Sequence, residues 1–545
     1  FAEKKDIQNN SLQISKLVSP YIVAFIINLI ATNTANDKYK KTDITETIGK
    51  IAFTEESSNG RFNYWGDAWK YIKENPVFAS GLGNWKIESI DKGKEHISGY
   101  TVPYHAHNDF IHVFAETGIL GGMAYLTLFI LIFYYIIRII LEKYKHNKSL
   151  NFEFFILILP FVVYIIDALL NFPVARPLMQ SSLAIYLGLI LVKYSNLNDY
   201  EHKFHQNRIT SKIFLFVLFI LIIPGLVIHI LSFTSLTKQG RLLYEFNTAN
   251  YTYTIDELDQ ISHDFPNLTE TAMPIKAMKA RYYYLKGQKD KAYEMIDMGM
   301  KDNPKIFFAE NLKAQFLLQE NKIDSAFFYA KKAFKGLPNN MPHFDIYMRT
   351  LAYKKMSSEI NDAFNRIRSI AGDSNSIWVI YLRTLAMTRS LGDPFSMGKA
   401  QEAYNLYPDD TNIFQLYRIL TYGQARVQEA EKLSLDAKSF YDQGKYLEAY
   451  ELWRKAVDID PLQKSHSLNA GLASFKLKNF NEAISFFNLA RSSKDNNIVE
   501  QSIRITALAF ISTGNNKRAC AEFVKLISNY PKRMYQQEFN KYCRS

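Results

Sequence analysis

The sequence has no basic stripe and very little cysteine. Its 65 Lys and Arg residues outnumber its 53 Asp and Glu residues, which gives a net charge of +12, yet the lysines are scattered and not interleaved with aromatic residues. Nucleic-acid binding requires a concentrated basic surface, so we expect no nucleic-acid partner. The two cysteines, Cys520 and Cys543, both lie near the C-terminus. In an oxidising compartment they could form a disulfide that ties down the last helix, although sequence alone does not establish this bond.

The sequence also lacks an initiating Met and a signal peptide. It begins with Phe, so we expect that an N-terminal portion precedes it. The length of 545 residues exceeds one ordinary domain and predicts two or three. The mean hydropathy of −0.16 averages two different regions. Uninterrupted apolar stretches occur in the first 235 residues, whereas the remainder is polar and evenly charged.

Five apolar segments are candidates for crossing a bilayer, which takes about 20 residues. The Lys and Arg residues of the short loops predict that the N-terminus is inside and that loops 33–118 and 172–177 are outside. With five spans, everything after the last span is also outside. ATP is absent there in most cells, so a synthetic reaction at this face needs a substrate that is already activated. The five segments are roughly 17–32, 119–140, 154–171, 178–193 and 212–233.

The outer loop contains a predicted amphipathic helix over residues 61–75. Trp65, Ala68 and Trp69 fall at helical spacing, and Ile72 continues the same face. We expect the following proline to end the helix, because the residue before a proline avoids helical geometry. The aromatic face either lies in the lipid headgroup layer or packs on the membrane domain.

The stretch YHAHNDFIHVFAETGILGG, residues 104–122, places three histidines just before the second span. A metal site is one interpretation, since His-x-His supplies ligands, but the spacing matches no strong zinc pattern. For His105 and His112 we favour a structural role in hydrogen bonding. For His107 we favour catalysis, either as a base or as an orienting group, which requires a pKa near neutrality and a nearby group that binds the leaving anion.

The order of the motifs resembles that of the O-antigen ligase and polymerase (Wzy-C) superfamily. They are R-(x)3-W, A-W, ENP, GLG, HAHND and AETGILGG, followed after a span by DALLNFPVARP, and the resemblance covers about residues 50–195. It implies a polytopic, metal-independent, all-α glycosyltransferase of the GT-C type that uses no cofactor. Such proteins take a glycan from an undecaprenyl-pyrophosphate carrier at the periplasmic face of the bacterial inner membrane. The acceptor is a lipid A–core sugar, a growing glycan or a protein hydroxyl.

The resemblance assigns roles to individual residues. His107 matches the histidine that orients or deprotonates the acceptor hydroxyl, and Arg61 matches the arginine that holds the pyrophosphate. A guanidinium suits that task because its fork binds phosphate oxygens in pairs and stays charged. Arg176 is either a second phosphate contact or a membrane-surface anchor. Asn108 either orients His107 or caps a helix, and we favour capping.

Two acidic residues complete the candidate substrate-binding set. Asp167 lies in an apolar span, where an ionisable group is costly and usually functional, and it either pairs with an arginine or lies at the water boundary. Glu116 either binds substrate or is only a charge near the start of a helix. The family has about a dozen spans and uses basic residues of an earlier outer loop. Either that first half is missing from this sequence or the chain is inactive alone.

A period of 34 residues characterises the second half. Tetratricopeptide repeats typically show, at this interval, a small residue, a turn, an Ala on the next helix and a terminal Pro. Such repeats stack into a curved α-solenoid. The pattern is clear over 280–340 and 434–531 and degraded between them. We expect tyrosines 282–284 to lie in the packing between helices. The repeated motifs are GQKDKA (287–292), NKIDSA (321–326), GKYLEA (444–449), KNFNEA (478–483) and, after a two-residue insertion, GNNKRA (514–519).

We therefore predict a membrane domain over residues 1–236 and a periplasmic repeat domain over 237–545. The expected partners are the lipid-linked glycan, its acceptor, the bilayer and a protein bound to the concave surface of the repeats. A rival interpretation is a non-catalytic membrane scaffold whose repeats recruit partners of envelope glycan assembly. Arg61 and His107 distinguish the two hypotheses, because a scaffold has no need of both residues at one outer cavity.

Overall fold

A computed structural model describes residues 55–147, 153–197 and 208–544. Within these ranges every regular element is a helix, and the β pairing is limited to an isolated bridge between Leu268 and Pro274. The predicted all-helical fold is therefore confirmed. The chain divides into two compact units, which are residues 1–316 with 331–340 and residues 317–330 with 341–545.

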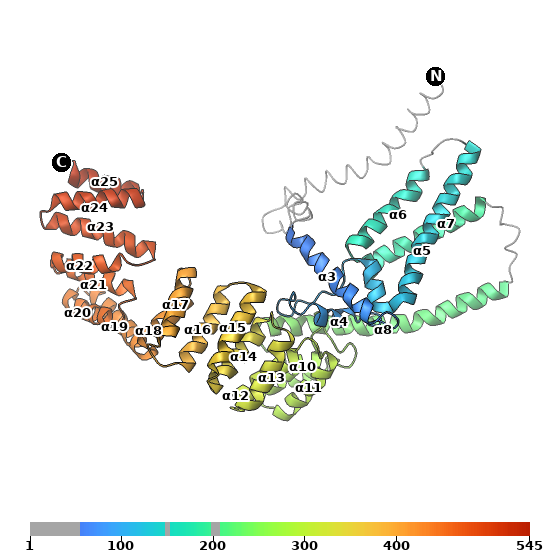
Figure 1. Ribbon diagram of the computed structural model, residues 1–545, viewed down its shortest axis with the longest axis horizontal. Coiled ribbons are helices and arrows are strands. Elements are labelled where there is room, and N and C mark those ends of the chain that lie inside the picture. Colours follow the sequence, from blue (N-terminus) through green and yellow to red (C-terminus); the bar gives the residue numbers. More distant parts are fainter. Residues whose placement is uncertain (1–54, 148–152, 198–207, 545) are drawn as a thin grey trace, which may run out of the picture. The chain divides into compact units, whose positions relative to one another are not determined.

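The first unit contains the apolar helices (Figure 1). Helix α5 packs against α6 and α7, and aromatic side chains such as Phe129, Phe161 and Tyr164 fill the space between them. The short helix η1 connects α6 to α7. The elements are α3 (Glu55–Glu74), α4 (Trp85–Lys92), α5 (Asp109–Asn147), α6 (Glu153–Leu170), η1 (Pro173–Ala175), α7 (Pro177–Leu197) and α8 (Arg208–Thr248).

Three helices of the described part of the chain are long and apolar enough to cross a membrane, over residues 109–142, 177–196 and 215–248. They contain all or most of the predicted spans 119–140, 178–193 and 212–233. The segment predicted at 154–171 corresponds to α6, which is a shorter apolar helix. The segment at 17–32 lies outside the described residues, so the count of five remains a prediction.

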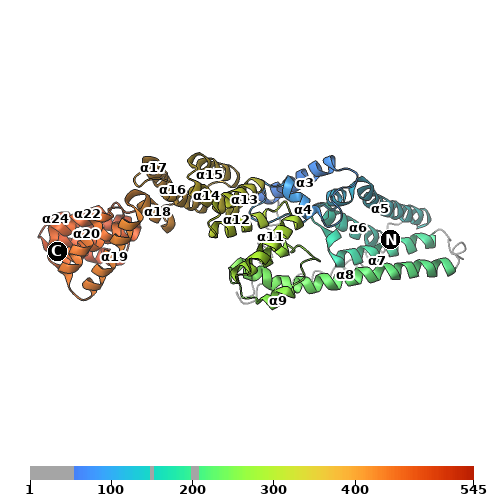
Figure 2. The same ribbon diagram turned by 90° about the horizontal axis from the view of Figure 1, so that it is seen from below.

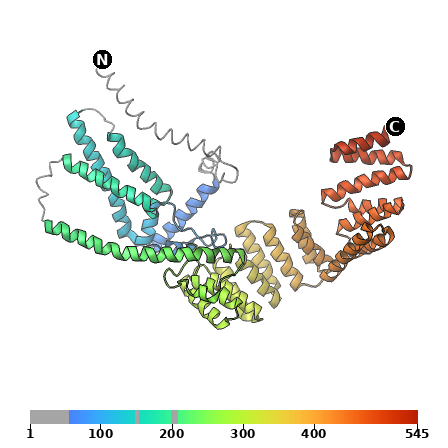
Figure 3. The same ribbon diagram turned by 180° about the vertical axis from the view of Figure 1, so that it is seen from behind.

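Helix α8 is a single long helix that leads from the apolar region toward the repeats (Figure 3). Its described side chains from 212 to 231 are exposed, and these residues are apolar almost throughout. A helix that is apolar on all sides requires an apolar surrounding, so this surface suits contact with lipid. The predicted domain boundary between residues 236 and 237 falls inside this helix.

Residues 97–102, in the loop that is predicted to lie outside, pack on the first repeat helices within the same compact unit. Ile97 and Val102 belong to a hydrophobic core that also contains residues of α10 and α11, such as Met278. Gly99 donates its N–H to the carbonyl of Asn339 at 2.9 Å and accepts a hydrogen bond from the side-chain amide of Asn340 at 2.8 Å. The helices that begin the array are α9 (Ile255–Asp259), α10 (Ile275–Leu285), α11 (Lys289–Asp302), α12 (Phe308–Gln319) and α13 (Ile323–Gly336) (Figure 2).

Each repeated motif forms the turn between two helices. The turn contains a residue with positive φ, and the Ala of the motif is fully buried where the two helices meet. Glycine and asparagine adopt this left-handed conformation at low cost, which explains the residue at this position in four of the five motifs, Lys478 being the exception. The predicted tetratricopeptide pattern is thus present in the structure. The turn residues are Gly287, Asn321, Gly444, Lys478 and Gly514, and the buried alanines are Ala292, Ala326, Ala449, Ala483 and Ala519.

The degraded middle of the array is also helical. Lys355 has a positive φ at 34 residues after Asn321, so the register of the turns continues. Trp378 and Leu382 are fully buried, as expected of repeat helices, and α14, α16 and α18 contact one another in succession. The tyrosines at 282 and 283 are also fully buried, as predicted. The remaining helices are α14 (Met341–Lys354), α15 (Ser357–Ala371), α16 (Asn375–Thr388), α17 (Pro394–Leu406), α18 (Thr411–Tyr422), α19 (Gln424–Asp442), α20 (Tyr446–Ile459), α21 (Lys464–Lys476), α22 (Phe480–Ala490), α23 (Asn496–Ser512), α24 (Asn516–Asn529) and α25 (Arg533–Cys543).

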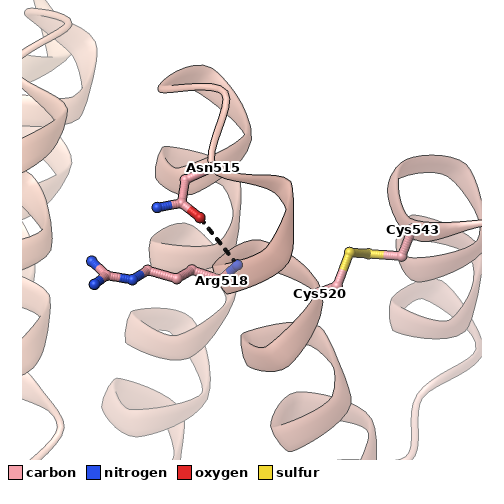
Figure 4. The surroundings of a disulfide bond; sticks show 4 residues. All are labelled: Asn515, Arg518, Cys520 and Cys543. Atoms are coloured by element: carbon pink, nitrogen blue, oxygen red, sulfur yellow. Dashed lines mark hydrogen bonds between the residues drawn. A yellow bond between two sulfur atoms is a disulfide. The ribbon is translucent and has the colours of Figure 1, made fainter.

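The last repeat is closed by a disulfide between Cys520 and Cys543 (Figure 4). Cys520 lies in α24 and Cys543 ends α25, and their Cα atoms are 5.7 Å apart. Asn515 caps α24 by accepting a hydrogen bond from the backbone N–H of Arg518 at 3.3 Å. The bond that the sequence permitted is therefore present, and it ties the final helix to the helix before it.

Candidate functional site

The segment after α3 closes over a sharp bend in α5. The bend is at Gly118, whose φ of 70° and ψ of −168° are accessible essentially to glycine alone. A Cβ at this position would lie 2.1 Å from the carbonyl oxygen of Val77, so the close approach of the two segments also requires glycine. The N–H of Gly81 donates to the carbonyl of Glu116 at 2.9 Å. The ENP, GLG and AETG motifs therefore meet in one packed junction.

The start of α5 is held by two polar side chains. The side-chain oxygen of Asn108 accepts a hydrogen bond from the N–H of Ile111 at 3.1 Å, which is the geometry of a helix cap. Asp109 is fully buried and accepts a hydrogen bond from the N–H of Val174 at 2.8 Å. Asp109 thereby joins α5 to the segment after α6. Sequence reasoning considered Asp109 only as an alternative helix cap or as a metal ligand, and it did not foresee this bond to Val174.

His107 lies beside α3, where it contacts Tyr64 and Trp65. Its φ of 51° is left-handed, which is uncommon for a residue other than glycine and concentrates at functional sites. Its ring stacks on Tyr64 with 5.9 Å between ring centroids and meets Phe172 edge-on at 5.2 Å. The indole N–H of Trp65 donates to its carbonyl oxygen at 3.3 Å. The ring nitrogen Nδ1 is buried and has no hydrogen-bond partner.

The surroundings of His107 lower its pKa. Burial lowers its pKa first, because the charged imidazolium loses solvation, and the positive charges of Arg61 and Arg176 lower it further. Arg61 comes from α3 and Arg176 from the segment after η1, and the charge of each acts on the same imidazole. A neutral imidazole can accept a proton, and a pair of fixed guanidinium groups attracts an anion. The structure thus brings Arg61, Arg176 and His107 together.

His105 shares the ring of Phe172 with His107 and also contacts His112. The ring of His105 stacks on Phe172 at 4.4 Å between centroids and contacts the ring of His112 at 5.2 Å. The Nε2 atom of His112 is 3.6 Å from the carboxylate of Glu116. The Nδ1 atoms of both histidines are buried without a hydrogen-bond partner. Packing of rings, more than the hydrogen bonding we expected, therefore holds His105, and burial lowers its pKa to about 4.

The remaining candidate residues have partners inside the protein. The guanidinium of Arg176 lies 3.7 Å from the carboxylate of Asp167 and 4.7 Å from the ring centroid of Phe172. Asp167 thus has the arginine partner that its place in an apolar segment suggested. Glu116 accepts a hydrogen bond from the N–H of Trp85 at 3.3 Å, which fixes the start of α4.

Two cavities adjoin this group of side chains. The smaller, about 230 Å³, is lined by Tyr64, Tyr104, His107 and Phe172, among others. The larger, about 590 Å³, shares Tyr104 and His105 with the smaller and extends toward α4 and α5. Tyr104 and His105 thus form a common wall. In the part of the chain that the structure describes, no group of three or more His, Cys, Asp or Glu side chains is arranged to hold a metal ion.

The family model described as O-antigen ligase (Wzy_C) matches residues 7–126. This match confirms the resemblance found in the sequence and supports a glycosyltransferase-type role in glycan assembly. Among curated proteins no match is found.

Several solved structures are similar to this chain. One is a chain of the APC/C hetero-tetramer Cut9–Hcn1, with 13% identity and a TM-score of 0.24, where the match covers 56% of this chain and 55% of that chain. Another is a tetratricopeptide repeat protein from Parabacteroides merdae, with 10% identity and a TM-score of 0.24, covering 49% and 96% of the two chains. A third is a tetratricopeptide protein from Thermus thermophilus, with 13% identity and a TM-score of 0.17, covering 50% and 98%. The assignment of the repeats here comes from the 34-residue period and the helix pairs described above.

Proposed function

We propose that this protein is a membrane glycosyltransferase that transfers a glycan from an undecaprenyl-pyrophosphate carrier to an acceptor hydroxyl. The reaction takes place at the periplasmic face of the inner membrane. The N-terminal side of the chain is cytoplasmic, and loop 33–118, segment 172–177 and the repeats are periplasmic. The disulfide between Cys520 and Cys543 supports this orientation, because disulfides persist in oxidising compartments.

The observation that carries the proposal is a half-buried histidine whose pKa is lowered by burial and by the charges of Arg61 and Arg176. The acceptor hydroxyl oxygen attacks the anomeric carbon of the glycan while the bond from that carbon to the pyrophosphate oxygen breaks. The imidazole of His107 takes the hydroxyl proton, for which its depressed pKa leaves it available. The departing pyrophosphate gains negative charge, and Arg61 and Arg176 stabilise that charge in the transition state.

The proposal names one class of donor and three classes of acceptor. Transfer to lipid A–core, to a growing glycan or to a protein hydroxyl requires the same leaving group and the same base. Stacked tetratricopeptide repeats generally form a concave surface, and such surfaces commonly bind polypeptide. We therefore propose that the repeats bind a protein, either as the acceptor or as a component of the glycan assembly machinery.

Substitution of the two site residues tests the proposal. We expect His107→Ala and Arg61→Ala each to lower transfer at least about 100-fold, the scale on which a general base or an electrostatic contact contributes. Transfer is measured with lipid-linked glycan extracted from cells that lack the gene, and by restoration of the surface glycan in those cells. Expression and thermal stability of each variant are measured in parallel.

The chain offers matched controls for both substitutions. His96 is an exposed histidine of the same outer loop, and Lys73 is an exposed cation of the same helix as Arg61. We expect His96→Ala and Lys73→Ala to retain transfer. The scaffold hypothesis predicts that His107→Ala also retains full function, so normal transfer by that variant would remove the enzymatic proposal.

A further inference from the structure

The larger cavity differs in chemistry from the surroundings of His107. Its volume of about 590 Å³ falls within the range of small-molecule sites, which is about 300–1,000 Å³. Its polar wall includes Lys86, Glu116 and Glu270, and its other walls include Tyr104, Val113 and His112. This lining combines carboxylates, one cation, aromatic rings and aliphatic groups.

The charges of this cavity disfavour the pyrophosphate. Two carboxylates, Glu116 and Glu270, face a single cation, Lys86. Burial lowers the pKa of Lys86, and the two carboxylates offset this shift only in part. An anionic ligand would meet net repulsion here, whereas the positive charges of Arg61 and Arg176 act on His107, which lines the adjoining cavity. The two cavities therefore suit different parts of one substrate, the anion beside His107 and an uncharged part beside Glu270.

A sugar ring is the uncharged group that fits best. Carboxylates and an ammonium group hydrogen-bond to hydroxyls at the edge of a ring, and such bonds to charged groups are among the stronger ones. Apolar and aromatic side chains such as Tyr104 and Val113 suit the C–H faces of the ring. The cavity also adjoins the catalytic histidine through Tyr104 and His105, so a sugar bound there remains next to the reacting atoms.

Glu270 reaches the cavity from a turn that precedes the first repeat. The turn is closed by a hydrogen bond from Thr269 N–H to Met273 O at 2.9 Å, and Thr269 is fully buried. The side-chain amide of Asn303, at the end of α11, donates to Ala272 O at 2.8 Å and fixes the turn from the other side. The turn therefore presents Glu270 from a well-held backbone, as a binding residue requires.

Building on the proposed function, we infer that this cavity is a sugar-binding subsite in which Glu270 and Lys86 bind hydroxyls of a sugar residue. The repeat-bearing half of the chain thereby supplies part of the substrate site. The sugar belongs either to the glycan of the carrier or to the acceptor, and both present the same hydroxyl chemistry.

Direct binding tests the inference without requiring turnover. The probe is the glycan released by mild acid from the lipid-linked pool of cells that lack the gene, and the protein is the full chain in detergent. Saturation-transfer NMR measures its Kd. We expect Glu270→Ala and Lys86→Met each to raise Kd about tenfold or more, as loss of a hydrogen bond to a charged group implies. Glu294→Ala, an exposed carboxylate on α11, is the matched control and should bind like the unchanged protein.

Kinetics then identify the source of the sugar. A rise in KM for the lipid-linked donor with kcat retained places the donor glycan in the cavity, and a rise in KM for the acceptor places the acceptor there. Unchanged Kd and unchanged KM values for Glu270→Ala would overturn the inference, and so would a fall in kcat alone. The proposed function fails differently, through normal transfer by His107→Ala while the released glycan still binds.

Discussion

Replacement of Gly118 by Ala should dismantle the junction that supports the candidate site. The φ of 70° and ψ of −168° cost a residue with a side chain about 1–3 kcal/mol. The new Cβ would also lie 2.1 Å from Val77 O and 2.8 Å from Val77 C, so the segment must move away from α5. That movement breaks the hydrogen bonds from Ile119 N to Pro76 O and from Gly81 N to Glu116 O, worth about 0.5–1.5 kcal/mol each. The sum is a destabilisation of about 2–6 kcal/mol.

The assay is thermal unfolding of the full chain in detergent, followed by transfer at a temperature where the variant remains folded. We expect Tm to fall by roughly 5 °C or more for Gly118→Ala, since about 1 kcal/mol corresponds to a few degrees in a unit of this size. Gly60→Ala on α3 is the control, because its Cβ would meet no atom within 4 Å and a helical Gly→Ala change stabilises by up to about 1 kcal/mol. An unchanged Tm together with unchanged transfer for Gly118→Ala would refute the reasoning.

Two further predictions follow from the site and from the end of the array. The transfer rate should fall at acidic pH as His107 becomes protonated. Arg176→Gln should move this fall to higher pH, because removing a nearby positive charge raises the pKa of His107. A fall in rate at the same pH in the variant and the unchanged protein would contradict this electrostatic assignment. Replacing both cysteines by Ser should make α25 more susceptible to proteolysis, because a disulfide across a separation of 23 residues stabilises by about 3 kcal/mol. Equal proteolysis of α25 with and without the disulfide would show that packing alone holds the helix.

The repeats were predictable because their signal is local. Each turn residue and each buried Ala lies a few positions from its neighbours in the motif, and the 34-residue interval repeats the same local solution. Even in the degraded middle, Lys355 keeps the interval although its motif has lost the small residue. The apolar helices were predictable for the same reason, since length and composition within one segment decide them.

The site was predictable only in part, because its contacts join distant segments. Residue types and motif order singled out Arg61, His107 and Arg176, and in the structure the charges of both arginines act on His107. The hydrogen bond from Val174 N–H to Asp109 joins residues that are 65 positions apart, and no periodic pattern in the sequence predicts it. The same holds for Glu270, which reaches the larger cavity from beyond the last apolar helix. Such residues become candidates only when the fold is known.

Gly99 forms hydrogen bonds with both Asn339 and Asn340, so the start of the solenoid supports the segment around Gly99. Shortening the protein at residue 237 would strip the apolar side chains of Ile97 and Val102 of their cover, so loss of activity in such a deletion would say nothing about recruitment. A truncation after Asn340 keeps these supporting contacts and removes most of the array. Comparison of the two truncations would separate the structural role of the first repeats from the binding role of the later ones.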